Sequence, residues 1–117
     1  MRITEAESVV LGALWRQGPL SFADLIAEVR ARSDWGDATI KTLLHRLMQK
    51  GAVRSEKTEG RQRYHAVLER RAYVETEIDD LVARLFGGDR AALRQVLAAD
   101  DEPSLIAAEA SLPGRQE

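Results

Sequence analysis

The sequence contains no cysteine among its 117 residues. That absence excludes disulfide bridges, zinc sites built on thiolates and cysteine nucleophiles. No run of about 18 apolar residues is present, so we expect no membrane insertion. The first residues also lack the basic and then apolar pattern of a secretion signal, and we expect a cytoplasmic protein.

Residues that carry catalysis are equally scarce. His45 and His65 are the only histidines, and no serine and aspartate pattern of a nucleophilic site accompanies them. The acidic runs at 79–80 and 100–102 are explained by solubility and by the dipoles of helix starts. Neither run has paired ligands at the spacing of a metal site. We therefore predict that the chain is not an enzyme and holds no metal ion and no cofactor.

Charge is abundant, and its two signs are unevenly distributed. Residues 1–68 carry 11 Lys and Arg against 8 Asp and Glu, a net charge of +3, whereas residues 69–117 carry a net charge of −5. Within 38–67, seven basic residues stand against two acidic ones. A basic block inside a folded segment is the electrostatic footprint of a protein that binds a polyanion. A solvated surface is the other explanation of the same composition.

The first 68 residues predict three helices followed by a hairpin. Capping patterns start helices at Thr4 and Ser21, and a third helix is expected from about 38 to 50. Alternating residues predict strands at 53–57 and 62–67, with all the residues between them forming a turn. This order, with its short link between the second and third helices, is that of a winged helix-turn-helix.

The third predicted helix has two faces of opposite character. At about 100° per residue, four other apolar side chains fall within about 80° of Ile40 and form a core face with it. The opposite face carries no acid. Its hydroxyl, imidazole, amide and cationic groups are those that meet phosphates and base edges in a major groove. The DNA contacts expected on this helix are Thr39, Lys41, Thr42, His45 and Arg46.

Position along the helix separates these contacts. Thr39 and Thr42 are expected near the bases, because a recognition helix usually reads bases with its N-terminal part. Lys41 and Arg46 are expected at phosphates or bases, and a bidentate contact of an arginine with guanine gives about 1–3 kcal/mol of discrimination. Plain solvent exposure, or an intramolecular salt bridge for Arg46, is the alternative.

The predicted hairpin carries further cations. Arg61 and Arg63 are expected at its tip, and Arg54 and Lys57 lie on the first strand. A wing commonly contacts the DNA backbone or the minor groove, where cations are favoured. Arg54, Arg61 and Arg63 are therefore candidate DNA contacts. Charged edge strands also prevent aggregation between sheets, which is the other explanation of these cations.

The residues after 68 return to a helical period. A helix is expected over 70–86, Asp89 can cap the next, 100–103 marks another helix start, and the tail from Pro113 is expected to be loose. The apolar surface of these helices is too large to remain in water, and a two-fold partner would cover it. The alternative is a monomer in which the helices fold back on the first domain. The side chains expected to form the dimer interface are Val74, Ile78, Leu81, Val82, Leu85, Phe86, Leu93, Val96 and Leu97.

Several segments resemble the penicillinase-repressor family, the BlaI/MecI/CopY group of winged-helix transcriptional regulators. The segments that carry the resemblance are 4–7, 14–15, 37–47, 51–53, 63–66 and 85–89, and the whole match extends from residue 3 to about 97. The resemblance implies a homodimeric repressor that binds a palindromic, double-stranded operator DNA. It also implies contacts to that DNA from Thr39, Lys41, Thr42 and Arg46.

The resemblance has implications for regulation as well. In parts of the family, a membrane-bound protease sensor leads to cleavage of the repressor in its C-terminal segment, so such a partner is implied. Around Arg94 to Leu97 we identify no cleavage signal. The copper-responsive members bind metal through cysteine pairs, which this chain lacks.

Two other functions remain compatible with a winged helix. A protein-interaction module would be favoured by an acidic or apolar outward face on the third helix, and here that face is basic and polar. Another ligand-responsive regulator would need a ligand pocket between the domains, and few aromatic residues are present to line it. The overall prediction is a mostly α fold with a small β-hairpin. It places a winged-helix DNA-binding domain at 1–68 and a helical dimerisation segment with a flexible tail at 69–117.

Overall fold

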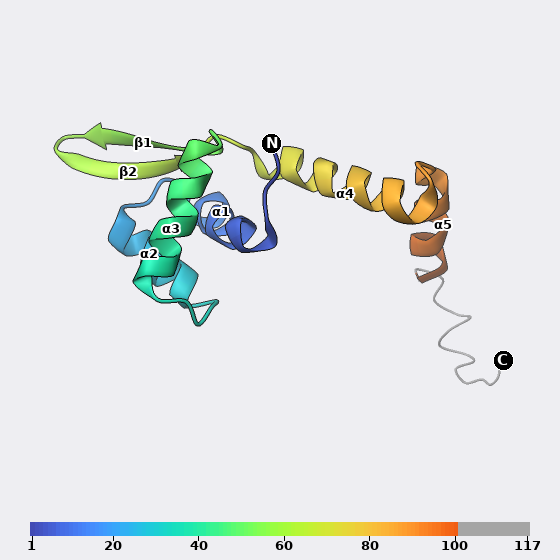
Figure 1. Cartoon of the computed structure of the whole chain (residues 1–117), viewed down its shortest axis with the longest axis horizontal. Coiled ribbons are helices and arrows are strands. Elements are labelled where there is room, and N and C mark those ends of the chain that lie inside the picture. The colour runs from blue at the N-terminus through green and yellow to red at the C-terminus, as the bar shows by residue number, and fades with distance from the viewer. Residues whose placement is uncertain (101–117) are drawn as a thin grey trace. The chain divides into compact units, whose positions relative to one another are not determined.

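The computed structural model describes residues 1–100, in which three helices, two strands and two further helices follow one another (Figure 1). The elements are α1 Glu5–Gln17, α2 Phe22–Arg30, α3 Asp37–Gln49, β1 Val53–Thr58, β2 Arg61–Ala66, α4 Arg70–Phe86 and α5 Arg90–Asp100. This order confirms the predicted fold class, mostly α with a small β-hairpin. Of the helix start predicted at 100–103, only Asp100 is described, as the last residue of α5, and the tail from Pro113 lies outside the described residues.

Capping groups mark the starts of three helices. The Thr4 hydroxyl accepts the N–H of Glu7 at 3.1 Å, and the Glu7 carboxylate accepts the N–H of Thr4 at 2.9 Å, which completes a capping box at α1. The Ser21 hydroxyl accepts a backbone N–H of α2 at 3.2 Å. The Asp89 carboxylate accepts two backbone N–H groups at the start of α5. The three caps predicted from the sequence are therefore confirmed.

The hairpin is longer, and its turn tighter, than the sequence predicted. β1 and β2 pair antiparallel from Val53 opposite Ala66 to Thr58 opposite Arg61. The turn between the strands consists of Glu59 and Gly60, both at positive φ. Two-residue hairpin turns need this backbone conformation, which glycine adopts without steric cost. The expectation that Thr58 and Arg61 belong to the turn was wrong, because they form the last pair of the ladder.

A further segment of the chain pairs with the hairpin through its backbone, and the sequence did not predict this pairing. Between α1 and α2, Leu20 forms an isolated antiparallel bridge with Tyr64. The Tyr64 N–H donates to the Leu20 carbonyl at 2.8 Å, and the Leu20 N–H donates back at 3.2 Å. A two-stranded hairpin is marginal alone, and this bridge fixes it to the helical part of the fold.

The core lies among α1, α2, α3 and the start of β1. Apolar side chains spaced three and four residues apart along each helix turn inward, as an amphipathic helix requires. The buried apolar residues of this cluster are Ile3, Val10, Leu11, Ala13, Leu14, Leu25, Val29, Ile40, Leu43, Leu44, Leu47, Ala52 and Val53. The core therefore includes four side chains of α3, the helix predicted to read DNA.

The chain after β2 is held on this core by Trp15. The indole N–H of Trp15 donates to the Leu68 carbonyl at 2.9 Å, and its ring lies 5.6 Å from that of Tyr73. The backbone N–H groups of Val67 and Leu68 both donate to the Ala52 carbonyl. The chain divides into two compact units, Met1–Tyr73 and Val74–Glu117, so the first unit includes the first turn of α4.

The second unit contains the rest of α4 and α5. Within it Val82 is buried, whereas Leu85, Val96 and Leu97 are 62%, 51% and 52% exposed. An ion pair between Arg90 and Asp79 links the two helices. Among the described residues, no helix is both long enough and apolar enough to cross a membrane.

Glu7 is the one buried charged side chain among the described residues. The Lys50 ammonium donates to its Oε1 at 2.6 Å and to the Arg2 carbonyl at 2.7 Å. Burial alone raises the pKa of the Glu7 carboxyl, but the hydrogen bonds from Lys50 and Thr4 and the Lys50 charge outweigh it. The pKa is therefore lowered from its ordinary value of 4.5. Lys50, part of the basic block in the sequence, thus joins the end of α3 to α1 and the N-terminus.

Removing the Lys50 ammonium should destabilise the fold in a pH-dependent way. In Lys50→Met the buried Glu7 carboxylate loses its cationic partner, and we expect the free energy of unfolding at pH 7 to fall by about 1–3 kcal/mol. Because the pKa of Glu7 is lowered in the native protein, the pair stabilises above pH 4.5 and its contribution is lost as pH falls through the native pKa. The difference in the free energy of unfolding between the wild type and Lys50→Met should therefore become smaller in acid.

Urea denaturation at pH 7 and in acid measures this effect. Lys41→Met is the matched control, because Lys41 is an exposed lysine of α3, the helix for which Lys50 is the C-cap. Equal stability of Lys50→Met and Lys41→Met at pH 7 would contradict the role assigned to the pair.

Candidate nucleic-acid interface

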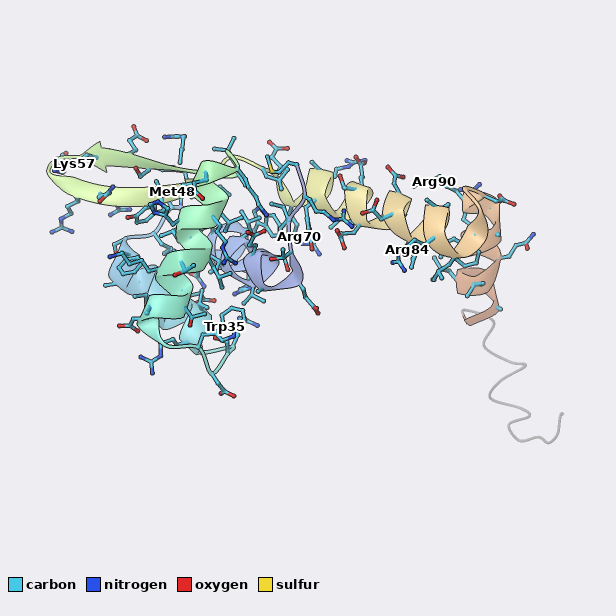
Figure 2. The ribbon with its side chains drawn as sticks, viewed as in Figure 1. Trp35, Met48, Lys57, Arg70, Arg84 and Arg90 are labelled. Atoms are coloured by element: carbon cyan, nitrogen blue, oxygen red, sulfur yellow. The ribbon has the colours of Figure 1, made fainter. Side chains whose placement is uncertain are left out.

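The link between α2 and α3 is short and is fixed by local contacts. The Ser33 hydroxyl donates to the Val29 carbonyl at 3.0 Å, and Trp35 is half-buried and packs against the core (Figure 2). Gly36 is the N-cap of α3 and forms no side-chain capping bond. Glycine is still an acceptable cap, and the Gly36 carbonyl accepts the Ile40 N–H at 3.2 Å. The two helices and this link form a helix-turn-helix.

α3 has one buried and one exposed face. Ile40, Leu43, Leu44 and Leu47 are buried in the core. Asp37, the first residue of α3, is also exposed, but its carboxylate pairs with Arg30 at 3.3 Å. We call the exposed residues after it the recognition face, and its members are Ala38, Thr39, Lys41, Thr42, His45, Arg46 and Gln49. The structure thus brings together all five predicted contacts on this helix, along with Ala38 and Gln49. None of the seven is acidic.

The two cations and the imidazole of the recognition face have no side-chain partner in the described part of the chain. Within residues 1–99, the side chains of Lys41, His45 and Arg46 make no hydrogen bond or ion pair with another residue. The alternative of an intramolecular salt bridge for Arg46 therefore has no support in this part of the chain. Thr42 differs from these residues, because its hydroxyl donates to the Ala38 carbonyl at 3.0 Å.

Two recesses mark the surface around the recognition face. One, of about 340 Å³, is lined by Lys41, Thr42, His45, Arg46 and Gln49. The other, of about 310 Å³, lies between α3 and the hairpin and is lined by Phe22, Lys41, Leu44, His45, Met48, Gln62 and Tyr64. Hydrogen-bonding groups and cations around shallow recesses can contact both phosphates and base edges.

The hairpin places its arginines on a different surface from the recognition face. Tyr64 and Gln62 line the recess against α3, and Arg61 and Arg63 alternate with them along β2. Successive side chains of a strand point to opposite faces, so Arg61 and Arg63 lie on the face turned away from α3. Arg54 lies opposite His65 in the register and shares that face. The structure therefore does not gather Arg54, Arg61 and Arg63 with the recognition face.

Arg54 is also engaged within the hairpin. Its guanidinium pairs with the Glu56 carboxylate at 3.0 Å, and Nε2 of His65 lies 3.2 Å from the same oxygen. The hydrogen bond and charge of Arg54, followed by the charge of His65, hold the pKa of the Glu56 carboxyl below its ordinary value. Of the three hairpin arginines, Arg54 is therefore the one whose charge is partly offset.

Strand alternation identifies two hairpin residues that the predicted contacts omitted. Lys57 pairs with Gln62 in the register, and Gln62 lines the recess beside α3. Lys57 lies toward the far end of the hairpin (Figure 2). The period of two along each strand was a signal in the sequence that could have separated Lys57 from the arginines.

No group of three or more His, Asp and Glu side chains that could hold a metal ion occurs among the described residues. The arrangement instead offers an exposed, cationic and polar helix face on a packed domain. Chemically, such a face can bind a polyanion.

The two faces of α3 should respond oppositely to truncation. Arg46→Ala removes an exposed side chain without a partner in the described residues, so the free energy of unfolding should change by less than about 0.5 kcal/mol. Leu43→Ala leaves a cavity in the core and should cost about 2–5 kcal/mol. Thermal and urea denaturation of both variants check this, and a large loss of stability in Arg46→Ala would contradict the face assignment.

Comparisons with known proteins agree with this architecture. Residues 3–109 match the sequence profile of a protein family described as penicillinase repressor. The chain is 35% identical over 85 residues to an uncharacterized 16.5 kDa protein of Latilactobacillus sakei, covering 73% of this chain and 58% of that protein. It is 31% identical over 88 residues to the penicillinase repressor of Bacillus licheniformis, covering 74% of this chain and 68% of that one. The match thus spans between about half and two thirds of the length of these relatives.

A solved structure gives the same result for the fold. The chain superimposes on the monomeric form of BlaI from Bacillus licheniformis, solved in complex with the blaP half-operator, with a TM-score of 0.57 and 29% identity. The superposition covers 62% of this chain and 89% of that one.

Proposed function

The chain belongs to the penicillinase-repressor family, and from this premise we propose that it is a transcriptional repressor that reads operator DNA with the recognition face of α3. The observation that carries the proposal is the composition of that face, which is exposed, free of acids and rich in cations and hydrogen-bonding groups. The BlaI neighbour, solved with a half-operator, supports the same use of the fold. The family is one of repressors, so we propose no enzymatic activity.

The proposed docking follows from the packing of α3. The major groove of B-DNA admits one helix, and the buried side of α3 keeps its polar side turned outward. Thr39 and Thr42 lie in the first half of the helix and are assigned to bases, while Lys41 and Arg46 are assigned to phosphates or bases. His45 lies between Thr42 and Arg46 in the sequence and belongs to the same face.

The contribution of the hairpin is more restricted than that of α3. Lys57 lies on the hairpin face toward α3, and we assign it to the phosphate backbone. Arg61 and Arg63 lie on the opposite face and reach DNA only around the tip of the wing. Arg54, held by Glu56, is the weakest of the predicted contacts.

We further propose that the repressor is a homodimer that binds a palindromic operator. Leu85, Val96 and Leu97 are large apolar side chains at least half exposed in the single chain, and a second copy would bury them. The other residues assigned to this interface are Val74, Ile78, Leu81, Val82, Phe86 and Leu93, of which Val82 is already buried. Two copies would present two α3 helices to half-sites about 34–36 Å apart, or a multiple of that distance.

Control by a membrane sensor-protease system is proposed from the family resemblance alone. Cleavage in the C-terminal segment would separate the dimer interface from the DNA-binding unit and so release the operator. A DNA-binding function also supports a cytoplasmic location. A protein-interaction module is disfavoured by the basic and polar recognition face.

Arg46 should be required for binding but not for folding. The full-length chain, mixed with a random pool of duplex DNA, should enrich an inverted repeat, and its affinity should fall as salt rises. Arg46→Ala should weaken binding to that repeat by about 5- to 150-fold for each half-site, the range that corresponds to about 1–3 kcal/mol for one contact. Arg84→Ala, which removes an exposed arginine of α4, is the control and should bind as the wild type does. Failure to enrich any sequence would contradict the proposed function.

The oligomeric state tests the assignment of α4 and α5. In Leu85→Glu, a charge replaces an exposed apolar side chain, so the single chain should fold normally while the dimer dissociates. Ala83→Glu is the matched control, because Ala83 is exposed on the opposite side of the same helix. Sedimentation equilibrium should give two chains for the wild type and Ala83→Glu, and one for Leu85→Glu. A Leu85→Glu variant that remains a dimer would place the interface elsewhere.

A further inference from the structure

The hydrogen bond inside the recognition face limits what Thr42 can offer to a ligand. Its hydroxyl donates its only proton to the Ala38 carbonyl at 3.0 Å, and both residues are exposed. The Thr42 oxygen can therefore accept a hydrogen bond from a ligand but has no proton left to donate. Thr39 differs, because its hydroxyl makes no such bond within residues 1–99.

The same hydrogen bond leaves the γ-methyl of Thr42 as the group that can contact a ligand beside the hydroxyl oxygen. With the hydroxyl turned toward the backbone of its own helix, the γ-methyl is the remaining group on Cβ. Ala38 lies one turn earlier on the same side of α3, so its methyl is a neighbour of the Thr42 side chain. The two residues form a small apolar strip, on a face whose other side chains include Lys41, His45 and Arg46.

We propose that this strip reads the C5-methyl group of a thymine, with Thr42 as the specificity-determining residue. Thymine is the one base that presents a methyl group in the major groove. Guanine presents only acceptors there, and Thr42 has no proton to give them. The adenine paired with that thymine presents an N6 amino group, which can donate a hydrogen bond to the Thr42 oxygen. The operator half-site therefore contains a T·A pair opposite Thr42.

This inference rests on the proposed function and is tested with the duplex that the full-length chain recovers from a random pool. Each thymine of that duplex is replaced in turn by deoxyuridine, which removes only the C5-methyl. Fluorescence anisotropy then gives the Kd of each duplex for the wild type. At one thymine in each half-site we expect binding to weaken by about fourfold, the effect of one buried carbon group.

Two variants separate the methyl group of Thr42 from its hydroxyl. Thr42→Ser keeps the hydroxyl and loses the γ-methyl in both copies, so it should bind the parent duplex about 15-fold more weakly, about fourfold for each half-site, and lose its response to deoxyuridine at that position. Thr42→Val keeps a γ-methyl and loses the hydroxyl, so it should lose affinity through the contact to the adenine amino group but keep the full response to deoxyuridine. Circular dichroism verifies that both variants fold.

The possible failures are distinguishable. If the wild type enriches no duplex, the proposed function fails and the inference fails with it. If a duplex is enriched but every deoxyuridine replacement leaves the Kd unchanged, the inference alone is overturned. It is also overturned if Thr42→Ser keeps the response to deoxyuridine, or if Thr42→Val loses that response as Thr42→Ser does.

Discussion

The burial of one side of α3 determines what its other side can do. Four apolar side chains of this helix lie in the core with those of α1 and α2, and each gains about 1.5–3 kcal/mol from burial. Because these side chains recur at helical spacing, their burial fixes the rotation of α3 about its own axis. The positions of Thr39, Lys41, Thr42, His45 and Arg46 follow from that rotation, so the recognition face exists only as long as the core is packed.

Three further contacts of the first unit fix the segments around α3. The buried Glu7–Lys50 pair joins the end of α3 to α1. The Leu20–Tyr64 bridge fixes the hairpin beside the helices. The bond from Trp15 to the Leu68 carbonyl secures the chain that leads into α4. Each joins segments far apart in the sequence, so the domain can present α3 as part of a rigid surface.

Local signals made much of this structure predictable. The capping groups at Thr4 and Ser21 and the period of α3 located the helices and the exposed face, because both depend on residues within one or two turns. The hairpin faces were not predicted, since Arg54, Arg61 and Arg63 were grouped by charge without regard to strand alternation. Such a grouping ignores that Tyr64 must turn inward, which places its neighbours on the outer face.

Pairings distant in sequence could not be found in the same way. Lys50 was indistinguishable from the other cations of the basic block until the structure placed it 2.6 Å from Glu7. The bridge from Leu20 to Tyr64 likewise has no local pattern, because each residue supplies only backbone groups to it. The bond from Thr42 to Ala38 is local, but a sequence does not reveal which rotamer an exposed threonine adopts.

We assign DNA binding to the recognition face of α3. The most direct test is to record amide and side-chain NMR shifts of the full-length, isotope-labelled chain while an enriched duplex is added. We expect the largest changes on the exposed residues from Ala38 to Gln49, with smaller changes at the tip of the hairpin. Changes concentrated on α4 and α5, with α3 unaffected, would contradict it.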